Sequence, residues 1–527
     1  MWSFRRTVCC GSLSMVFCAG GVVGLGQQTS ADVPTIKLNS TLVFLDVTVV
    51  DKKGRPVVKG LTQDDFTITE GKKPQRIFSF EAPELHKLGR NAKDEGQDAK
   101  APVTIFVLDL LNSSFEDIGY IRYSVRKFLD AQPERLNAPA EMMVIGDWSF
   151  EMIQGYTRDK QDLLYALDHL PAVNPFKVSR GSFTWERFEQ SMDALQQIAL
   201  QNDGVEGRKN IVWVGRGGPG INSDRLLIPN ADKLQRYIHT AANMLVDARI
   251  SLFVIYPGLK VSGRALTKSE GEAEATLGND DPFAGDINFG LFVNETGGKL
   301  FYNRNDVDAE MEKSVKMGSE YYTLTYQPHD VTPDGKFRRI RVALRDPNLH
   351  AVTKAGYFAP EKDQASDPRE EMLVHLAEAV RATIPFTALP LKVTKVVRHP
   401  DTRTAEITVQ TPTGALDWLP TETGSSAGLI MAAASLNGSR NILASKLERI
   451  EFASKETDPA KHPNVSARVT VTLRMPRSAQ DVRVVLRTEQ EGRMGAVEVS
   501  RKTLDAAPAT PTPEPQLAPK PAAGSKD

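Results

Sequence analysis

Between residues 103 and 316 the chain alternates short apolar runs with amphipathic segments, and this alternation limits the possible folds more than any other feature. The runs VTIFVL (103–108), EMMVIGD (141–147), NIVWV (210–214) and ISLFVIY (250–256) are apolar enough for strands that are covered on both faces. A further short strand is expected at 299–302, and helices are expected over 118–129, 158–170, 185–200, 231–248, 287–295 and 307–316. The pattern predicts an α/β domain over residues 101–318, with a mainly parallel, doubly wound (Rossmann-like) sheet.

Residues on both sides of this region have the alternating pattern of β-strands. Runs at 41–50, 66–69 and 76–80 predict an N-terminal β module over residues 36–84. Residues 321–327 and 338–344 are expected to form an antiparallel pair within a β extension, 319–360, that packs with this module. The runs LKVTKVV, TAEITVQ, GLIMAAASL, ARVTVTLRM, VRVVLR and GAVEVSR predict a C-terminal β-sandwich over residues 385–503. Residues 504–527, rich in proline and alanine, are expected to form a disordered tail.

The N-terminus has the features of an export signal. Arg5 and Arg6 precede an apolar run of small residues at 8–25 that is short for a membrane span. We therefore predict a signal peptide over residues 1–31, export to the periplasm or the extracellular space, and no transmembrane segment beyond it. An uncleaved anchor and a lipid anchor at Cys18 are the alternatives.

Cysteine positions and net charge exclude several classes of function. All three cysteines, Cys9, Cys10 and Cys18, lie in the predicted signal peptide, so the mature chain would have no thiol for disulfides, catalysis or metal binding. The formal net charge is −1, which gives no electrostatic support for nucleic-acid binding. The chain contains no H-E-x-x-H, and Pro219 removes an amide that a phosphate-binding loop at 215–220 would need.

A candidate site follows the first strand of the predicted sheet. Ligands of open α/β sheets bind beyond the carboxyl ends of the strands. Asp109 ends this strand, where we expect its side chain on a solvent-facing rim, and Asn112 and Ser113 follow in the next loop. Carboxylate, amide and hydroxyl oxygens in one small volume suit Mg²⁺ or Ca²⁺. The alternative is that Asp109 and Ser113 satisfy loop amides and cap the next helix.

This segment is similar to the first strand and metal loop of von Willebrand factor type A domains, whose metal-ion-dependent adhesion site begins D-x-S-x-S. Further similarity lies in VFLDVTVVDKKGRPVVKGLTQDDFTITEGKKPQRIFSFE, RKNIVWVGRGGPG, YYTLTYQPHDVTPDGKFRRIRVAL and KAGYFAP. Together these stretches resemble the von Willebrand factor type A-related family known mainly from Acidobacteria, over residues 38–360. The resemblance implies a von Willebrand factor type A domain and a role in recognition.

The family's metal site carries over only in part. Asp109 matches the family's aspartate and Ser113 its second serine, whereas Leu111 stands at the first serine position and Asn112 lies between them. One aspartate with neutral oxygens makes a weak site for a divalent cation.

The distant parts of the metal site carry over less well. Thr184 is the best match for the family's threonine, with Ser182 as the second choice. The usual aspartate after the central strand falls in VGRGG, where Arg216 brings a positive charge instead. An acidic stretch at 257–286 follows a strand and could supply carboxylates or shield this face. The resemblance thus implies a degenerate metal site of Asp109, Ser113 and Thr184 within a ligand-binding face of Asp109, Asn112, Ser113, Ser182, Thr184 and Arg216.

These features predict an exported, non-enzymatic recognition or adhesion protein. It would bind a protein or cell-envelope ligand through the carboxyl-end face of its α/β domain, with or without a cation. One alternative is an envelope scaffold in which the β modules make the contacts, and another is a metal-dependent hydrolase, for which no acid, base or nucleophile constellation is found.

Overall fold

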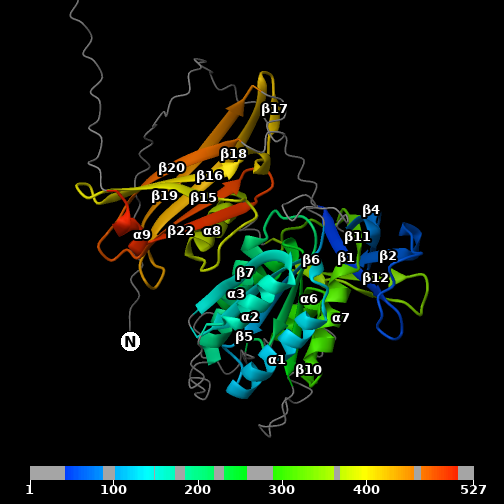
Figure 1. Cartoon of the computed structure of the whole chain (residues 1–527). Helices are drawn as coiled ribbons and strands as arrows, with labels where there is room; N and C mark the ends of the chain where they lie inside the picture. Colours follow the sequence, from blue (N-terminus) through cyan, green and yellow to red (C-terminus); the bar gives the residue numbers. More distant parts are fainter. Residues whose placement is uncertain are drawn as a thin grey trace, which may run out of the picture. The chain divides into compact units, whose positions relative to one another are not determined.

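The α/β region has a central sheet with helices around it (Figure 1). Six strands form this sheet, in the order β10-β9-β8-β5-β6-β7. Five of them pair in parallel: β5 (Val103–Asp109), β6 (Arg135–Gly146), β8 (Lys209–Val214), β9 (Ile250–Pro257) and β10 (Lys299–Arg304). The chain enters at β5, continues to β6 on one side and returns to β8 on the other. The predicted mainly parallel sheet with flanking helices is confirmed, and the ends of β5 and β8 lie at the point where strand order reverses.

The computed structural model describes residues 42–86, 101–147, 149–171, 184–218, 231–257, 289–360, 368–455 and 465–508. The predicted signal peptide, Ser182 and the part of the predicted tail after residue 508 lie outside these ranges. No helix among the described residues has the length and apolar composition needed to cross a membrane.

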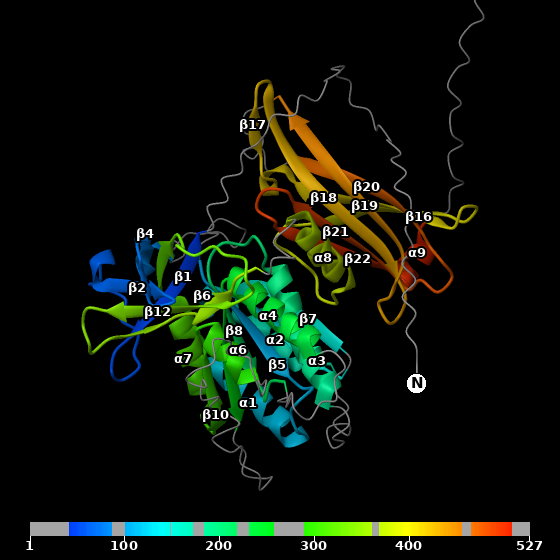
Figure 2. The same cartoon turned by 180° about the vertical axis from the view of Figure 1, so that it is seen from behind.

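Helices cover the two faces of the central sheet because successive strand residues point in opposite directions (Figure 2). Ile105 and Val107 of β5 join one apolar core, and Phe106 and Leu108 join the other. The first core includes residues of α3 (Thr184–Gln201), α4 (Ala231–Asp247) and α6 (Phe289–Glu295). The second includes residues of α1 (Phe115–Ala131), α2 (Lys160–Asp168) and α7 (Val307–Ser319).

One strand of this sheet was not predicted. β7 (Ser149–Asp159) runs antiparallel to β6 at the edge of the sheet, and the helix expected from residue 158 begins only at Lys160. Of the β7 residues, only Phe150 is buried. An edge strand of this kind lacks the continuous apolar run that identifies central strands in a sequence.

The N-terminal strands and the residues after α7 form two four-stranded sheets. One has the order β13-β1-β11-β4 and the other β14-β12-β2-β3. Their bounds are β1 (Val43–Val50), β2 (Phe66–Glu70), β3 (Lys73–Gln75), β4 (Ile77–Glu81), β11 (Tyr322–Tyr326), β12 (Phe337–Leu344), β13 (His350–Val352) and β14 (Gly356–Phe358), with short 3₁₀ helices at Gln63–Asp65 and Pro83–His86.

The expected pairing of β11 with β12 is wrong. β11 pairs with β1 and β4, and β12 pairs with β2 and β14. Tyr322 and Leu324 of β11 share an apolar core with Ile68 and Ile340 from the other sheet. Residues in different sheets can cover this core from two sides, which adjacent strands of one sheet could not do.

Buried polar contacts join β1 to the α/β region. Arg249 Nε, just before β9, donates to Asp46 Oδ2 at 3.0 Å. The buried Arg208 donates from Nη1 to Thr48 Oγ1 at 2.8 Å and from Nε to Ser251 Oγ at 2.9 Å. Because both guanidinium groups have fixed partners on two elements, they set the position of β1 on the end of the sheet.

Two further sheets make up the C-terminal region. One has the order β15-β16-β20; in the other, β17-β18-β21-β22, β19 also pairs with β18. The bounds are β15 (Lys392–His399), β16 (Thr404–Pro412), β17 (Leu419–Thr421), β18 (Gly424–Leu436), β19 (Ile442–Ser454), β20 (Ser466–Arg474), β21 (Asp481–Thr488) and β22 (Met494–Ser500), with α8 (Pro368–Arg381) before them, a 3₁₀ helix at Thr413–Ala415 and α9 (Arg501–Ala506) after them. β19 was not predicted, and most of its residues are exposed or half-buried. The first residues of the predicted tail belong to α9.

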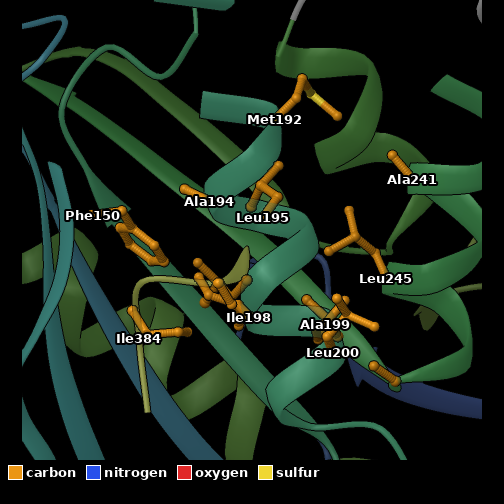
Figure 3. Packing of buried hydrophobic residues seen from close by; sticks show 14 of the residues in the cluster. Phe150, Met192, Ala194, Leu195, Ile198, Ala199, Leu200, Ala241, Leu245 and Ile384 are labelled. Atoms are coloured by element: carbon orange, nitrogen blue, oxygen red, sulfur yellow. The ribbon is translucent and has the colours of Figure 1, made fainter. Parts of the chain in front are cut away.

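The core of the α/β region extends to the residues that follow α8. In Figure 3, Leu195 and Ile198 of α3 lie among Phe150, Leu245 and Ile384. Polar contacts support this packing, since Gln197 Oε1 accepts a hydrogen bond of 2.8 Å from the backbone N–H of Thr383.

One buried carboxyl group in the central sheet gives a testable property. Glu141 on β6 is fully buried, and its Oε2 accepts a hydrogen bond of 3.2 Å from Gln201 Nε2. Its Oε1 has no hydrogen-bond partner among the described residues. Burial raises the pKa of Glu141 from 4.5 to about 8. The pKa of Glu141 is higher in the folded state than in the unfolded state. Its contribution to the free energy of unfolding therefore falls as the pH rises from 4.5 and is lowest above pH 8.

We expect Glu141→Gln to raise the free energy of unfolding by about 2 kcal/mol at pH 8, since a neutral amide avoids the cost of the buried charge. Near pH 4.5 the gain should vanish. Urea unfolding at both pH values measures the difference, with Glu151→Gln on an exposed position of β7 as the control. An equal gain at both pH values would contradict a pKa near 8.

Candidate functional site

The candidate site lies where β5 and β8 end beside the N-terminus of α1. Asp109 closes β5, and Asn112 and Ser113 follow it in the loop to α1. Gly215, Arg216 and Gly217 follow β8. The structure therefore brings four of the six candidate residues together: Asp109, Asn112, Ser113 and Arg216. Asp109, which we expected on a solvent-facing rim, is 0% exposed, and that expectation was wrong.

Asp109 is buried because backbone and side-chain donors of its own chain surround it. Oδ1 accepts from the backbone N–H of Asn112 at 2.8 Å, and Oδ2 accepts from Trp213 Nε1 at 3.0 Å and from the Gly217 N–H at 2.8 Å. Asn112 Nδ2 lies 3.2 Å from both oxygens. Burial raises the pKa of Asp109, and these hydrogen bonds oppose that rise.

The glycines after β8 allow their loop to cover Asp109. Gly215 has a φ of 144°, and a Cβ there would lie 2.4 Å from Asp109 Cβ and 3.1 Å from Ser113 Oγ. Gly217 has a φ of 71°, and a Cβ there would lie 2.5 Å from the Phe289 ring. Any larger residue at these positions would move the loop, and with it the Gly217 amide, away from the carboxyl group.

Arg216 extends from this loop over the end of β9. Its guanidinium carbon lies 5.0 Å from the centre of the Tyr256 ring, and Nη2 lies 3.5 Å from Asp117 Oδ2. Asp117 is buried and forms a capping box with Ser114 at the start of α1. The side chain of Arg216, 38% exposed, is thus held between two elements while part of it faces solvent.

A second arginine contributes to the charge near Asp109. Arg187 lies in the first turn of α3 and is half-buried. Burial lowers the pKa of Arg187, and the charge of Arg216 lowers it further, while the charge of Asp109 opposes both. Arg187 therefore interacts electrostatically with Asp109, whereas the charge of Arg216 faces Asp117.

The two candidates from the segment before α3 are not tested by this geometry. Ser182 lies outside the described residues. Thr184 is the first residue of α3, and the structure describes its backbone but not its side chain. Ser191, further along the same helix α3, instead contacts the site. Its Oγ accepts from Asn112 Nδ2 at 3.1 Å and donates to the Arg187 carbonyl oxygen at 2.8 Å.

Sequence reasoning missed Trp213, Ser191 and Gly217 as partners of Asp109. Trp213 lies in an apolar run that indicates a buried strand, and nothing in the run distinguishes its indole N–H as a donor. The glycines of VGRGG were the one available signal, since a glycine-rich strand end indicates close backbone approach.

The described residues do not fit a divalent cation. N–H donors surround both oxygens of Asp109, Leu111 is a buried apolar side chain, and the Asp117 carboxylate faces Arg216. Ser113 Oγ and Asn112 Oδ1 are buried and have no hydrogen-bond partner among the described residues, but two neutral oxygens do not offset the dehydration of Mg²⁺ or Ca²⁺. Among the described residues there is no group of three His, Cys, Asp or Glu side chains that could hold a metal ion. The acidic stretch at 257–286 lies outside the described residues, apart from residue 257.

Comparisons with known proteins give distant structural likeness only. No family model matches the chain, and no curated protein matches it. The SpRpn10 VWA domain is similar with a TM-score of 0.22 and 15% identity, covering 41% of this chain and 97% of that domain. A point mutant of the PilB minor pilin from Streptococcus sanguinis has a TM-score of 0.27 and 14% identity, covering 52% of this chain and 78% of that one. With TM-scores this low, neither likeness decides the function. The central sheet with its helices is compatible with the expected von Willebrand factor type A-like fold.

Replacing the Asp109 carboxyl group by an amide should destabilise the chain. In Asp109→Asn every orientation of the new NH₂ group faces at least one N–H donor, so at least one hydrogen bond is lost. We expect the free energy of unfolding to fall by about 2 kcal/mol, as measured by urea unfolding at neutral pH. The exposed Asp64→Asn serves as the control. A stability equal to the parent chain would show that these hydrogen bonds contribute nothing.

Divalent cations should not stabilise the chain through this site. Ligand binding to the folded state raises the melting temperature. Since this site does not fit a divalent cation, the chain should have the same Tm in millimolar Mg²⁺ or Ca²⁺ as in EDTA. Differential scanning calorimetry provides the measurement. A rise in Tm that Asp109→Asn abolishes would contradict the donor geometry described above.

Proposed function

We propose that this chain is an exported, non-enzymatic recognition or adhesion protein related to the acidobacterial von Willebrand factor type A-like family. In this proposal the α/β domain binds a protein or cell-envelope ligand through the face at the carboxyl ends of β5, β8 and β9. The metal site is degenerate, and ligand recognition does not depend on a cation.

The observation that carries this proposal is that an exposed aromatic residue and a partly exposed arginine both lie at this end of the sheet. Phe115, the first residue of α1, is 69% exposed, and Arg216 is tied to the same helix end through Asp117. Aromatic and arginine side chains are enriched among the residues that dominate the binding energy of protein interfaces. The hydrogen bonds around Asp109 support the proposal because they hold both loops in place before a ligand arrives.

A catalytic role receives no support from the same geometry. Asp109 is fully buried, and its oxygens face N–H groups of the chain, so it has no access to a substrate. The metal-dependent hydrolase considered from the sequence would also need a cation, which these donors do not fit. Non-enzymatic binding is therefore the simpler proposal.

An envelope scaffold is the second candidate, in which the β sheets make the contacts. The polar contacts between regions favour it, since Arg208, Arg249 and Gln197 connect the α/β region to its neighbours through hydrogen bonds. The scaffold also has exposed apolar side chains available, among them Phe78 on β4, which is 74% exposed.

Matched double substitutions distinguish these two functions. We expect Phe115→Ala with Arg216→Ala to reduce at least tenfold the amount of ligand captured, because each truncated interface anchor costs on the order of 1–2 kcal/mol. The control is Phe78→Ala with Arg76→Ala, which removes the same residue types from an exposed part of the N-terminal sheets. Each full-length chain is crosslinked to the envelope fraction of the cells that produce it, and the captured components are quantified by mass spectrometry.

Loss of the same components only in the first double variant would support recognition through the carboxyl-end face. Loss only in the control pair would support the scaffold and contradict the proposal. Melting curves of both variants, equal to the parent, are required so that a reduced capture is not caused by unfolding.

A further inference from the structure

The C-terminal region has a polar, basic sheet face that the proposed function does not use. In the sheet β15-β16-β20, exposed and buried residues alternate along β20, and half-buried and buried residues alternate along most of β16. Ile407, Val409 and Val471 point into the apolar core of this region. Their neighbours in sequence point to the opposite face, where every second residue of β20 from Ser466 to Arg474 is exposed.

Strand register places basic and hydrogen-bonding side chains in rows across this face. Residues directly opposite each other in antiparallel strands point to the same side. Gln410 pairs with Lys392 on one side and with Arg468 on the other. In the next row, Thr408 pairs with Lys395 and with Thr470. Farther along β15, Val397 and His399 pair with Glu406 and Thr404 but are buried, so the exposed basic residues of β15 on this face are Lys392 and Lys395.

The side chains of these rows also contact one another, which confirms their common orientation. Thr408 Oγ1 and Thr470 Oγ1 are 3.0 Å apart. Lys395 Nζ lies 3.1 Å from Glu406 Oε1. Arg468 Nε and Nη2 lie 2.5 and 3.1 Å from the Gln410 amide, and they donate to its oxygen when the amide is oriented with that oxygen toward Arg468. In this orientation the neighbour of the Arg468 guanidinium group is a neutral side chain.

The charges on this face are unbalanced. Lys392, Lys395, Arg468 and Arg474 face Glu406 as the single acidic side chain in the three strands, an excess of three positive charges. The whole chain, by contrast, has a formal net charge of −1. Among the described carboxylates none forms an ion pair with Lys392, Arg468 or Arg474. A concentrated basic field of this kind attracts polyanions.

The residue types on this face indicate which class of polyanion it can bind. The three strands contain no Phe, Tyr or Trp, so there is no platform on which nucleic-acid bases could stack. The exposed positions of β20 are serine, threonine and arginine, without the apolar residues that enter a lipid surface. Hydroxyl, amide and cationic groups on a flat sheet match a linear polymer rich in hydroxyl and carboxylate groups. The face extends about 20 Å from Arg468 to Arg474 and about 10 Å across three strands.

We propose that the exposed face of the sheet β15-β16-β20 binds a linear acidic polysaccharide. Lys392, Arg468 and Arg474 pair with its carboxylates, and Thr408, Thr470 and Gln410 form hydrogen bonds with its hydroxyl groups. This binding surface is separate from the carboxyl-end face and does not depend on the function proposed for that face.

The test uses the full chain and immobilised polygalacturonate, a linear polymer of uronic acids, with neutral dextran as the reference polymer. We expect binding to polygalacturonate at low ionic strength that weakens as NaCl is added, because salt screens exposed charges. Lys392→Gln with Arg468→Gln should weaken binding about tenfold, since two exposed charge contacts are removed. The matched control is Lys59→Gln with Arg76→Gln, two exposed basic residues of the N-terminal sheets, which should bind as the parent does.

Several results would overturn the proposal. These are an absence of binding at low salt, equal binding to dextran, and an unchanged affinity of the Lys392→Gln/Arg468→Gln variant. A single-stranded oligonucleotide or anionic phospholipid vesicles that bind more tightly than polygalacturonate, and lose binding in this variant, would reassign the face to another partner. Equal melting temperatures of all variants verify that the sheet is intact.

Discussion

The hydrogen bonds to the Asp109 carboxyl group are the constraint on which the candidate binding face depends. They connect the end of β5, the loop that begins α1 and the glycine loop after β8. A carboxyl group at this depth is tolerated only because donors surround it, and the donors in turn fix the loops that carry them. Arg216 and Phe115 therefore project from a framework whose backbone has one arrangement, although both side chains are themselves exposed.

This arrangement also changes the chemistry of the site relative to the one that the family resemblance implies. An adhesion site based on a metal ion needs an aspartate with free lone pairs and a second acidic residue. Here Trp213 and Gly217 supply N–H groups to Asp109, and Arg187 supplies positive charge. Protein groups thus balance the aspartate electrostatically without a bound cation, at the cost of making it inaccessible to ligands.

Much of the fold could be predicted from particular residues, and the failures have a common physical origin. The runs that became β5, β8 and β9 were identified because both faces of these strands are buried. β7 and β19 were missed because edge strands carry polar residues on both faces. The wrong pairing of β11 with β12 arose because neighbouring strands in sequence usually pair, whereas these two cover one core from different sheets.

The sequence by itself determined the helical or strand-like spacing of apolar residues in each segment and the ends of the buried strands. It also determined the loss of acidic residues at the expected metal site. All three depend on local composition. Only the tertiary structure decided that Asp109 is buried, that an indole and a glycine amide complete its hydrogen bonds, and that basic residues from β15 and β20 share one face. Such contacts join residues far apart in the chain, as Asp109 and Gly217 are, and their geometry follows from how the sheets and loops pack together.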